Sequence, residues 1–272
     1  MSFVLSDSTF NQLAEFIKEK TGIHIPPTKK YLIENRLFKT LEDYNLKGYD
    51  EYLFLLKYSS NGREVNRLFD AITTNETFFF REPLQFDVFI DHILPSVIER
   101  KHGMKNIRIW SAACSSGEEP YTLSMLLKEK RPDVTAEIIA TDISQQVIRT
   151  AENGVYSSYS IRNVDDGYMR KYFIKRNETY VLDEKIKHSV RFRPHNMLSA
   201  LRPPELNNFD VVFCRNVLIY FDIKTKQEAV STTYDSLVQG GYLVIGSSES
   251  LHNVTRAFKP TTIDKVVVYE KS

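Results

Sequence analysis

The sequence predicts an all-α N-terminal domain followed by an α/β domain with a parallel, Rossmann-like sheet. In about the first 75 positions, apolar residues recur at helical spacing without strand-like alternation. After about residue 105, short apolar runs alternate with amphipathic helical segments, which is typical of a parallel sheet covered on both faces. A last apolar run near the C-terminus follows a turn-rich stretch rather than a helix, which predicts a late hairpin on that sheet.

The N-terminal part contains four predicted helices. In the first, Phe10, Leu13, Ala14 and Ile17 form an apolar stripe; Asp7 or Ser8 is the expected N-cap, and Gly22 the expected end. The others are expected at about 28–44, around Tyr52–Leu56 and around Val65–Ile72. We place the domain boundary near residue 75, so the two domains cover 1–75 and 76–272.

In the second domain, a helix near Leu84–Glu99 precedes the alternating pattern. The predicted strands are IRIWSA, EIIATDI, FDVVFC, GYLVIGS and the final KVVVYE, and the predicted helices are TLSMLLKEK, QQVIRTAEN and TKQEAVSTTYDSLV. A strand-like core with a polar turn interrupts the alternation after a helix near Asp165–Phe173. This interruption predicts a small β-subdomain at about 174–190.

Composition restricts the cellular setting and the kinds of partner. The chain has 272 residues, of which 42% are hydrophobic, so it can bury a sizeable core. Its formal net charge of +1 predicts no general attraction to nucleic acid or anionic membranes. Two distant cysteines, Cys114 and Cys214, argue against a disulfide framework. Without a predicted signal peptide or membrane span, we expect a cytoplasmic monomer that holds no metal, binds no nucleic acid and does not insert into membranes.

Two features predict a nucleoside-containing ligand. Small residues cluster at Ser111–Gly117, where the first strand passes into a helix, and small side chains let a ligand approach the backbone. Asp142 ends the second strand about 25 residues later, where an acid can accept hydrogen bonds from both ribose hydroxyls. The alternatives are a tight structural turn and an N-cap for the next helix. Neither feature distinguishes NAD from S-adenosylmethionine.

Two further motifs place polar residues near the expected ligand. Arg215 and Asn216 directly follow the strand FDVVFC, and Tyr220 comes shortly after; ligands in such sheets lie at strand carboxyl ends. Aromatic residues at such positions often only pack a loop. The segment TTNETFFFRE places a polar, turn-forming start on an aromatic run at the domain junction.

Together, TTNETFFFRE, IWSAACSSGEEPYTL, ATDIS, FDVVFCRNVLIYFD and GYLVIGSSESL closely resemble the chemotaxis receptor methyltransferases, the CheR family. The resemblance covers nearly the whole chain. It implies a class I methyltransferase domain with a small inserted β-subdomain, S-adenosylmethionine as methyl donor, and glutamate side chains of methyl-accepting chemotaxis receptors as acceptors.

The resemblance also implies the site residues. Arg81 and Tyr220 match positions beside the transferring methyl group. The cofactor-binding positions match Asn75, Thr77, Arg81, Glu118 or Glu119 (with Glu119 favoured), Asp142, Asn196, Met197, Arg215 and Asn216. Met197 replaces a leucine of the family pattern.

One departure from the family pattern bears on receptor binding. Members that bind a receptor's C-terminal pentapeptide have a longer, glycine-containing loop in the β-subdomain, whereas IKRNETYVLDEKIKHSVRF is shorter and has no glycine. We therefore expect an enzyme that does not depend on the pentapeptide. Lys29, Arg36 and Lys39 fall on one face of the second predicted helix and form a candidate patch for acidic receptor helices. The alternative for this patch is an ordinary solvated face.

Three alternative functions make different demands on the sequence. A methyltransferase for RNA would need a basic, aromatic-rich surface, and a small-molecule acceptor stays open. A dehydrogenase would need a glycine-rich fingerprint and a hydride-transfer acid, and the only candidate acid is the lone His195. A non-catalytic signalling module that binds S-adenosylmethionine or S-adenosylhomocysteine would not need to retain Arg81 and Tyr220.

Overall fold

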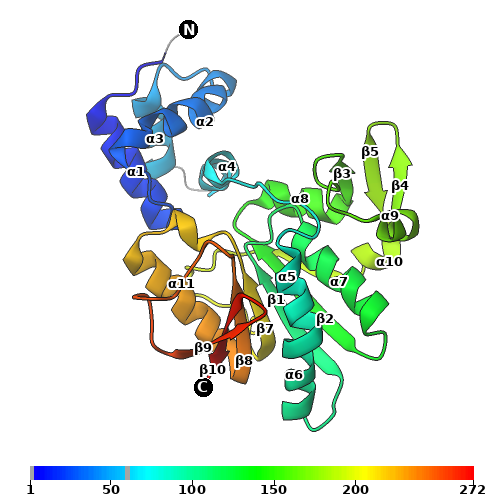
Figure 1. The fold of residues 1–272 in the computed structure, drawn as a ribbon. Helices are drawn as coiled ribbons and strands as arrows, with labels where there is room; N and C mark the ends of the chain where they lie inside the picture. The colour runs from blue at the N-terminus through cyan, green and yellow to red at the C-terminus, as the bar shows by residue number, and fades with distance from the viewer. Residues whose placement is uncertain (1–2, 59–61) are drawn as a thin grey trace.

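The computed structural model describes residues 3–58 and 62–272, which form a helical domain and a larger α/β domain (Figure 1). The helical domain buries the apolar stripes of its helices in one core, which includes Leu13, Ile33 and Leu37. Its elements are α1 (Asp7–Thr21), η1 (Pro27–Lys29), α2 (Lys30–Asp43), α3 (Tyr49–Tyr58) and α4 (Arg63–Ile72). The four predicted helices are therefore confirmed.

The start of α1 differs from the prediction. Ser6 is the N-cap, and its side-chain oxygen accepts the backbone N–H of Thr9 at 3.1 Å. Asp7 already belongs to the helix, and its carboxylate pairs with Lys30 of α2 at 2.7 Å. Gly22 ends the helix as predicted, with a left-handed φ of 76°.

The α/β domain is built on a seven-stranded sheet in the order β6-β2-β1-β7-β8-β10-β9. The strands from β6 to β8 are parallel, whereas β10 pairs antiparallel with both β8 and β9, which confirms the predicted late hairpin. The strands are β1 (Asn106–Ala112), β2 (Thr135–Asp142), β6 (Val190–Pro194), β7 (Phe209–Cys214), β8 (Leu237–Ile245), β9 (Phe258–Ile263) and β10 (Val266–Lys271). The chain order reverses between β1 and β7, and ligands in open α/β sheets bind at such a point.

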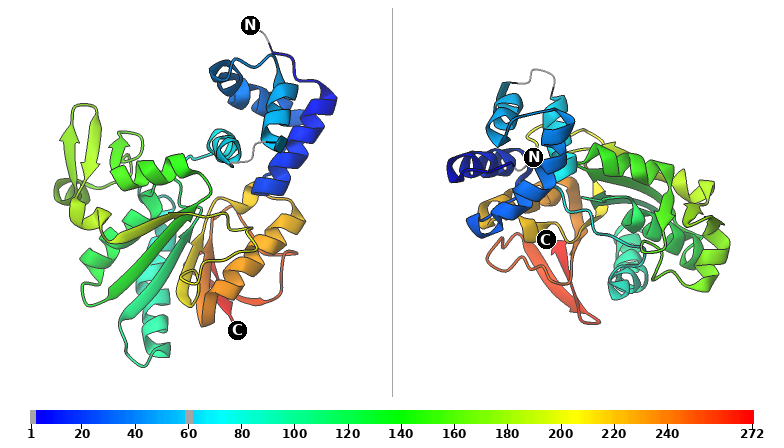
Figure 2. Two further views of the ribbon diagram at one scale, coloured as in Figure 1. Left: turned by 180° about the vertical axis from the view of Figure 1, so that it is seen from behind. Right: turned by 90° about the horizontal axis from the view of Figure 1, so that it is seen from above.

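Helices cover both faces of this sheet (Figures 1 and 2). Alternate residues of β1 point to opposite faces: Ile109 joins the core under the helices before and after β1, and Trp110 joins the core under α11. The helices are α5 (Pro83–Val88), η2 (Phe89–Ile93), α6 (Leu94–Arg100), α7 (Glu118–Lys130), α8 (Gln145–Asn153) and α11 (Ile223–Ser236). The helix predicted near Leu84–Glu99 is present, with η2 as a π-helical turn in its middle.

A separate three-stranded sheet in the order β3-β5-β4 stands beside α9 and α10, away from the helical domain (Figure 1). Its elements are β3 (Val155–Ser157), α9 (Asp166–Tyr172), β4 (Phe173–Arg176), β5 (Thr179–Leu182) and α10 (Glu184–Lys187). The sequence prediction of 174–190 omitted β3. A strand of three residues is too short to show a clear alternation, and only its pairing with β5 reveals it.

The two domains meet where α1 ends. The backbone N–H of His24 donates to the carbonyl of Tyr220 at 2.9 Å, and Lys18 pairs with Asp222 at 2.9 Å. Ile23 forms an isolated antiparallel bridge with Phe221. The segment that leaves α1 is therefore bonded to the loop that follows β7. No helix within residues 3–58 and 62–272 has the length and apolar character needed to cross a membrane.

Candidate functional site

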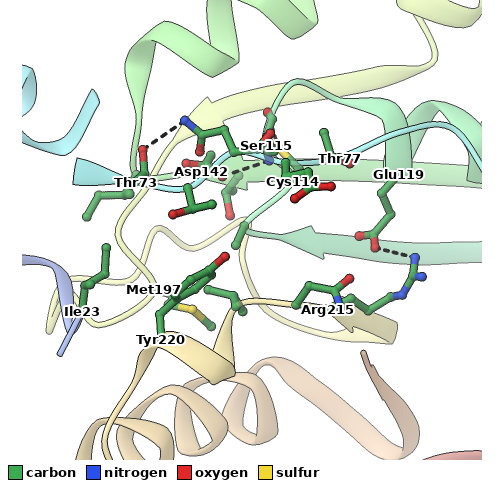
Figure 3. A pocket seen from close by; sticks show the side chains of 18 of the residues that line it. Ile23, Thr73, Thr77, Cys114, Ser115, Glu119, Asp142, Met197, Arg215 and Tyr220 are labelled. Atoms are coloured by element: carbon green, nitrogen blue, oxygen red, sulfur yellow. Dashed lines mark hydrogen bonds and ion pairs between the residues drawn. The ribbon is translucent and has the colours of Figure 1, made fainter. Parts of the chain in front are cut away.

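A cavity opens at the carboxyl ends of β1, β2 and β7, and both domains line it (Figure 3). The helical domain contributes Thr21 and Ile23, and the linker after α4 contributes residues 73–78. The residues that the sequence singled out and that line the cavity are Asn75, Thr77, Arg81, Glu119, Asp142, Asn196, Met197, Arg215, Asn216 and Tyr220. Segments far apart in the chain therefore converge at the point where the strand order reverses.

The turn after β1 exposes its backbone to this cavity. Ala113, Ser115 and Gly117 all have left-handed φ values, of 58°, 50° and 91°. At Gly117 a Cβ atom would lie 2.8 Å from the Cβ of Ala151, so this position excludes any side chain. Ala113, Cys114 and Ser115 line the cavity, so a ligand can lie close to the main chain there.

Asp142 joins the ends of β1 and β2. It is only 6% exposed; its Oδ2 accepts the backbone N–H of Ser115 and its Oδ1 that of Ser144, both at 2.9 Å. Burial raises the pKa of Asp142, although these N–H donors oppose the shift. The N-cap of α8 is Ser144, so the alternative reading of Asp142 as that cap is wrong. Each carboxylate oxygen has two lone pairs, so Asp142 can still accept hydroxyl hydrogen bonds.

Arg215 lies between two carboxylates at the end of β7. Its Nη1 donates to Glu119 at 2.9 Å, and its Nη2 lies 3.3 Å from Glu82 and donates to the carbonyl of Arg81 at 2.6 Å (Figure 3). The Arg215 side chain is 2% exposed. Its charge is therefore neutralised within the protein, and its clearest role is to connect β7 to α7 and to the linker.

The structure distinguishes the two adjacent acids at the start of α7. Glu119 lines the cavity, and its Oε1 accepts the hydroxyl of Ser111 at 2.7 Å. Glu118 does not line the cavity; it is 1% exposed, and its Oε2 accepts the hydroxyl of Ser116 at 2.8 Å. Burial raises the pKa of Glu118. Successive helical residues point about 100° apart, so only one of the pair can face the cavity.

The side-chain amide of Asn196 is bonded within the protein on both sides. Its Nδ2 donates to the carbonyl of Lys20 at 2.8 Å, and its Oδ1 accepts the backbone N–H of Leu198 at 3.0 Å. Asn196 thus ties the loop after β6 to the end of α1. Met197, in the same loop as Asn196, extends into the cavity, and so does Tyr220, the last residue of the 3-10 turn η3 (Leu218–Tyr220) (Figure 3).

Two carboxylates that the sequence analysis did not single out hold the loop that carries Asn216 and Tyr220. Glu249 accepts the backbone N–H groups of Asn216 at 2.8 Å, Gly246 at 2.7 Å and Ile219 at 3.2 Å. Burial raises the pKa of Glu249. Glu82 accepts the side-chain amide of Asn216 at 3.3 Å. Although Glu249 lies in one of the quoted motifs, GYLVIGSSESL, only the fold brings its carboxylate to this loop.

The remaining predicted groups lie as follows. Cys114 and Cys214 are both buried and unpaired. His195 lines the cavity, and burial lowers its pKa. In the described part of the chain, no His, Cys, Asp and Glu residues gather in a group of three or more that could hold a metal ion.

The fold and the site define a class of protein. A parallel sheet with a reversal point, a small-residue turn after its first strand, an acid at the end of the second and a terminal antiparallel hairpin characterise the methyltransferase version of the Rossmann plan. The chain belongs to the CheR methyltransferase family: its SAM binding domain model matches residues 75–267, and its all-alpha domain model matches residues 8–73. The predicted family, fold class and cofactor, S-adenosylmethionine, are therefore confirmed, and the dehydrogenase alternative is excluded.

Known relatives agree with this assignment. The chain is 35% identical over 272 residues to chemotaxis protein methyltransferase 2 of Vibrio cholerae serotype O1, covering 98% of this chain and 94% of that protein. It is 37% identical over 254 residues to the chemotaxis protein methyltransferase of Borreliella burgdorferi, which covers 91% of this chain and 89% of that protein.

Proposed function

We propose that this protein transfers the methyl group of S-adenosylmethionine to glutamate side-chain carboxylates of methyl-accepting chemotaxis receptors. The products are glutamate methyl esters and S-adenosylhomocysteine, and the setting is the cytoplasm, where a monomer meets the receptor helices. The main support is that Arg81 and Tyr220 line the same cavity as Asp142. Within the described residues Arg81 has no carboxylate partner; its Nη1 donates to the carbonyl of Glu76 at 2.9 Å. It is thus a cation available to an acidic group.

The residues of the cavity fit the cofactor. The small-residue turn lets a ligand approach the backbone, and Asp142 keeps lone pairs for two ribose hydroxyls. Asn75, Thr77, Glu119, Met197 and Asn216 would surround the rest of the molecule, with Asn196 contributing through its backbone because its amide is already bonded. Bound S-adenosylmethionine supplies an activated methyl group on a sulfonium.

The proposed mechanism needs no general base. A glutamate carboxylate has an ordinary pKa of about 4.3 and is ionised at neutral pH, so it attacks as it enters. In our proposal, Arg81 and the Tyr220 hydroxyl hold the acceptor carboxylate in line with the methyl group. The apolar walls around Met197 and Phe221 exclude water from it. Orientation of this kind supplies at best about 7–11 kcal/mol of the barrier reduction.

The deciding experiment is transfer of labelled methyl from S-adenosylmethionine to receptor-containing membranes, followed by mild base. We expect label on the receptor that leaves as methanol, which identifies a carboxyl methyl ester. If the protein binds the cofactor but labels no receptor, the proposal is wrong, and the alternative of a non-catalytic S-adenosylmethionine-binding signalling module takes its place.

Two variants test the proposed catalytic residues. Tyr220→Phe and Arg81→Ala should each lower turnover by about tenfold or more, since each removes an orienting hydrogen-bond donor. Tyr234→Phe is the matched control because its ring packs against the core under α11, outside the cavity. Full turnover in both test variants, with unchanged cofactor affinity, would exclude these roles.

We also propose that the receptor's C-terminal pentapeptide is not required. Only Asn177 and Glu178 separate β4 from β5, so the hairpin is short. Calorimetric titration with a receptor-tail peptide should give no micromolar binding, and such binding would show that the proposal is wrong.

A further inference from the structure

Two arginines lie over the ring of the same phenylalanine beside the cavity. The guanidinium carbon of Arg81 lies 5.8 Å from the centroid of the Phe78 ring, and that of Arg162 lies 3.4 Å from it. Arg162 also lies 3.7 Å from the centroid of the Tyr159 ring. Phe78 and Arg81 line the cavity, whereas Arg162 is exposed to solvent. We call Phe78, Arg81, Tyr159 and Arg162 the arginine ledge.

Hydrogen bonds and ring contacts connect the arginine ledge to the turn after β1. The backbone N–H of Phe79 donates to the carbonyl of Ser160 at 2.9 Å, which joins the two segments of the ledge. Phe79 itself is fully buried, with its ring 4.8 Å from that of Tyr156. The Tyr156 hydroxyl donates to the carbonyl of Ser116, in the turn after β1, at 2.8 Å. The ledge is therefore held in place relative to the cavity.

Both guanidinium groups of the arginine ledge lack a carboxylate partner in the part of the chain that the structure describes. Arg162 donates to the carbonyl of Tyr159 at 2.6 Å, and Arg81 to that of Glu76. The Glu76 carboxylate accepts the Tyr159 hydroxyl at 2.7 Å instead, and this hydrogen bond raises the pKa of Tyr159. A guanidinium has five N–H donors, so each arginine keeps several for a ligand. This contrasts with Arg215, which two carboxylates already neutralise.

We propose that the arginine ledge recognises an acidic helical segment of the acceptor: Arg162 binds a second carboxylate about one helical turn from the glutamate that enters the cavity. This inference rests on the proposed function. Both guanidinium groups lie over one ring, so together they can reach acidic side chains one turn apart on a helix, whose Cβ atoms lie about 5–6 Å apart. The Phe78 and Tyr159 rings lie at 76° to each other and confine the Arg162 guanidinium between them, which preorients this planar group for a bidentate bond to a carboxylate.

A ledge of this kind determines which glutamate of an acidic helix is methylated. Complementary charges at the edge of an interface mainly set the register and the encounter rate. A segment with a single acid would satisfy Arg81 alone, whereas a segment with acids one turn apart would satisfy both arginines. The proposed specificity is therefore for acid pairs rather than for isolated acids.

The test compares Arg162→Glu, Arg162→Ala and Arg162→Lys with Arg170→Glu, an equal charge change at an exposed position on α9. The KM for receptor-containing membranes and the Kd for S-adenosylhomocysteine are measured at low and high salt. We expect Arg162→Glu to raise the receptor KM by about tenfold or more at low salt and by less at high salt, because salt screens exposed charges. Arg162→Lys should give an intermediate KM, and Arg170→Glu and the Kd should not change.

Each other outcome has a defined meaning. If the wild type methylates receptors and Arg162→Glu leaves their KM unchanged, the ledge inference is overturned and the proposed function stands. If the wild type places no base-labile label on receptors, the proposed function falls and the ledge inference falls with it. If Arg162→Glu weakens binding to receptor-free anionic lipid vesicles as much as to receptor membranes, the ledge binds lipid and the inference is overturned.

Discussion

The side-chain amide of Asn196 donates a hydrogen bond to the backbone carbonyl of Lys20 at 2.8 Å, across the boundary between the two domains. It connects the loop after β6 to the last turn of α1, next to Thr21 and Ile23, which line the cavity. The helical domain thus lines part of the cavity that we propose for the cofactor, and its docking should affect cofactor affinity.

Gly22→Ala tests this coupling. Gly22 has a left-handed φ, and a Cβ there would lie 2.4 Å from Leu198 and 2.6 Å from Thr225. An alanine in this conformation costs about 1–2 kcal/mol even without a clash, so we expect lower stability in urea and a higher Kd for S-adenosylhomocysteine. Gly48→Ala is the control, since nothing lies within 4 Å of its added Cβ. A destabilised Gly22→Ala protein with normal cofactor affinity would show that docking and binding are independent.

Asp142→Asn should weaken binding of S-adenosylhomocysteine by about tenfold or more, because charge-assisted hydrogen bonds to ribose hydroxyls are replaced by neutral ones. Isothermal titration measures this directly. Asp166→Asn, at an exposed position in the first turn of α9, is the control. An unchanged Kd for Asp142→Asn would mean that its carboxylate only joins the ends of β1 and β2.

Glu249→Gln should impair the loop of Asn216 and Tyr220 without touching the cavity directly. The amide of glutamine turns a donor toward backbone N–H groups that Glu249 now accepts. An unpaired buried N–H costs about 1–3 kcal/mol, which corresponds to a loss of about fivefold to 160-fold in kcat/KM. Glu178→Gln, in the exposed turn between β4 and β5, should behave like wild type. Normal kcat/KM in Glu249→Gln would exclude this positioning role.

Titration of Glu249 should have opposite effects on stability and on activity as the pH changes. Burial raises the pKa of Glu249 above its usual value. The folded state therefore favours the protonated form of Glu249. Its contribution to the free energy of unfolding is fully present below its pKa in the unfolded state, and is lost as the pH rises through its pKa in the folded state. Activity needs the ionised form and should fall as pH drops through the same raised pKa. A pH profile of kcat/KM for Glu249→Gln that keeps the wild-type acid limb would contradict this assignment.

The candidate receptor patch does not lie on a single helix, because Lys29 ends η1, whereas Arg36 and Lys39 belong to α2. Lys29 and Lys39 are exposed, but Arg36 is partly buried and donates to the carbonyls of Ile72 and Thr73 and to the hydroxyl of Thr74. Reversing the charge at Arg36 should therefore disturb the linker that leads into Asn75 and Thr77, and raise the Michaelis constants for both cofactor and receptor. We expect Lys29→Glu with Lys39→Glu to raise only the receptor KM, by about threefold to tenfold. An unchanged receptor KM would show that this face is only solvated.

Local patterns in the chain were sufficient for most of the fold. Apolar runs located α1 to α4 and the strands β1, β2, β7, β8 and β10, because burial imposes such runs; β9, which is mostly exposed, lay in the stretch predicted to be turns. The prediction failed where local signals are short or degenerate: Ser6 rather than Asp7 or Ser8 caps α1, and β3 has too few residues to show alternation. The assigned roles of the cavity residues and the boundary near residue 75 stay predictions.

Strand and helix order and the small-residue turn were enough to predict a Rossmann-like fold for a nucleoside-containing ligand, and the resemblance of five motifs to the CheR family identified an S-adenosylmethionine-dependent methyltransferase. Which side chains keep free hydrogen-bonding capacity became clear from the folded structure alone. Two carboxylates neutralise Arg215, and both ends of the Asn196 amide are bonded within the protein. In the described ranges, Arg81 and Arg162 each donate to a backbone carbonyl and have no carboxylate partner. Charge neutralisation and burial depend on residues that are distant in sequence, such as Glu82 and Glu119 beside Arg215, and local patterns therefore do not reveal them.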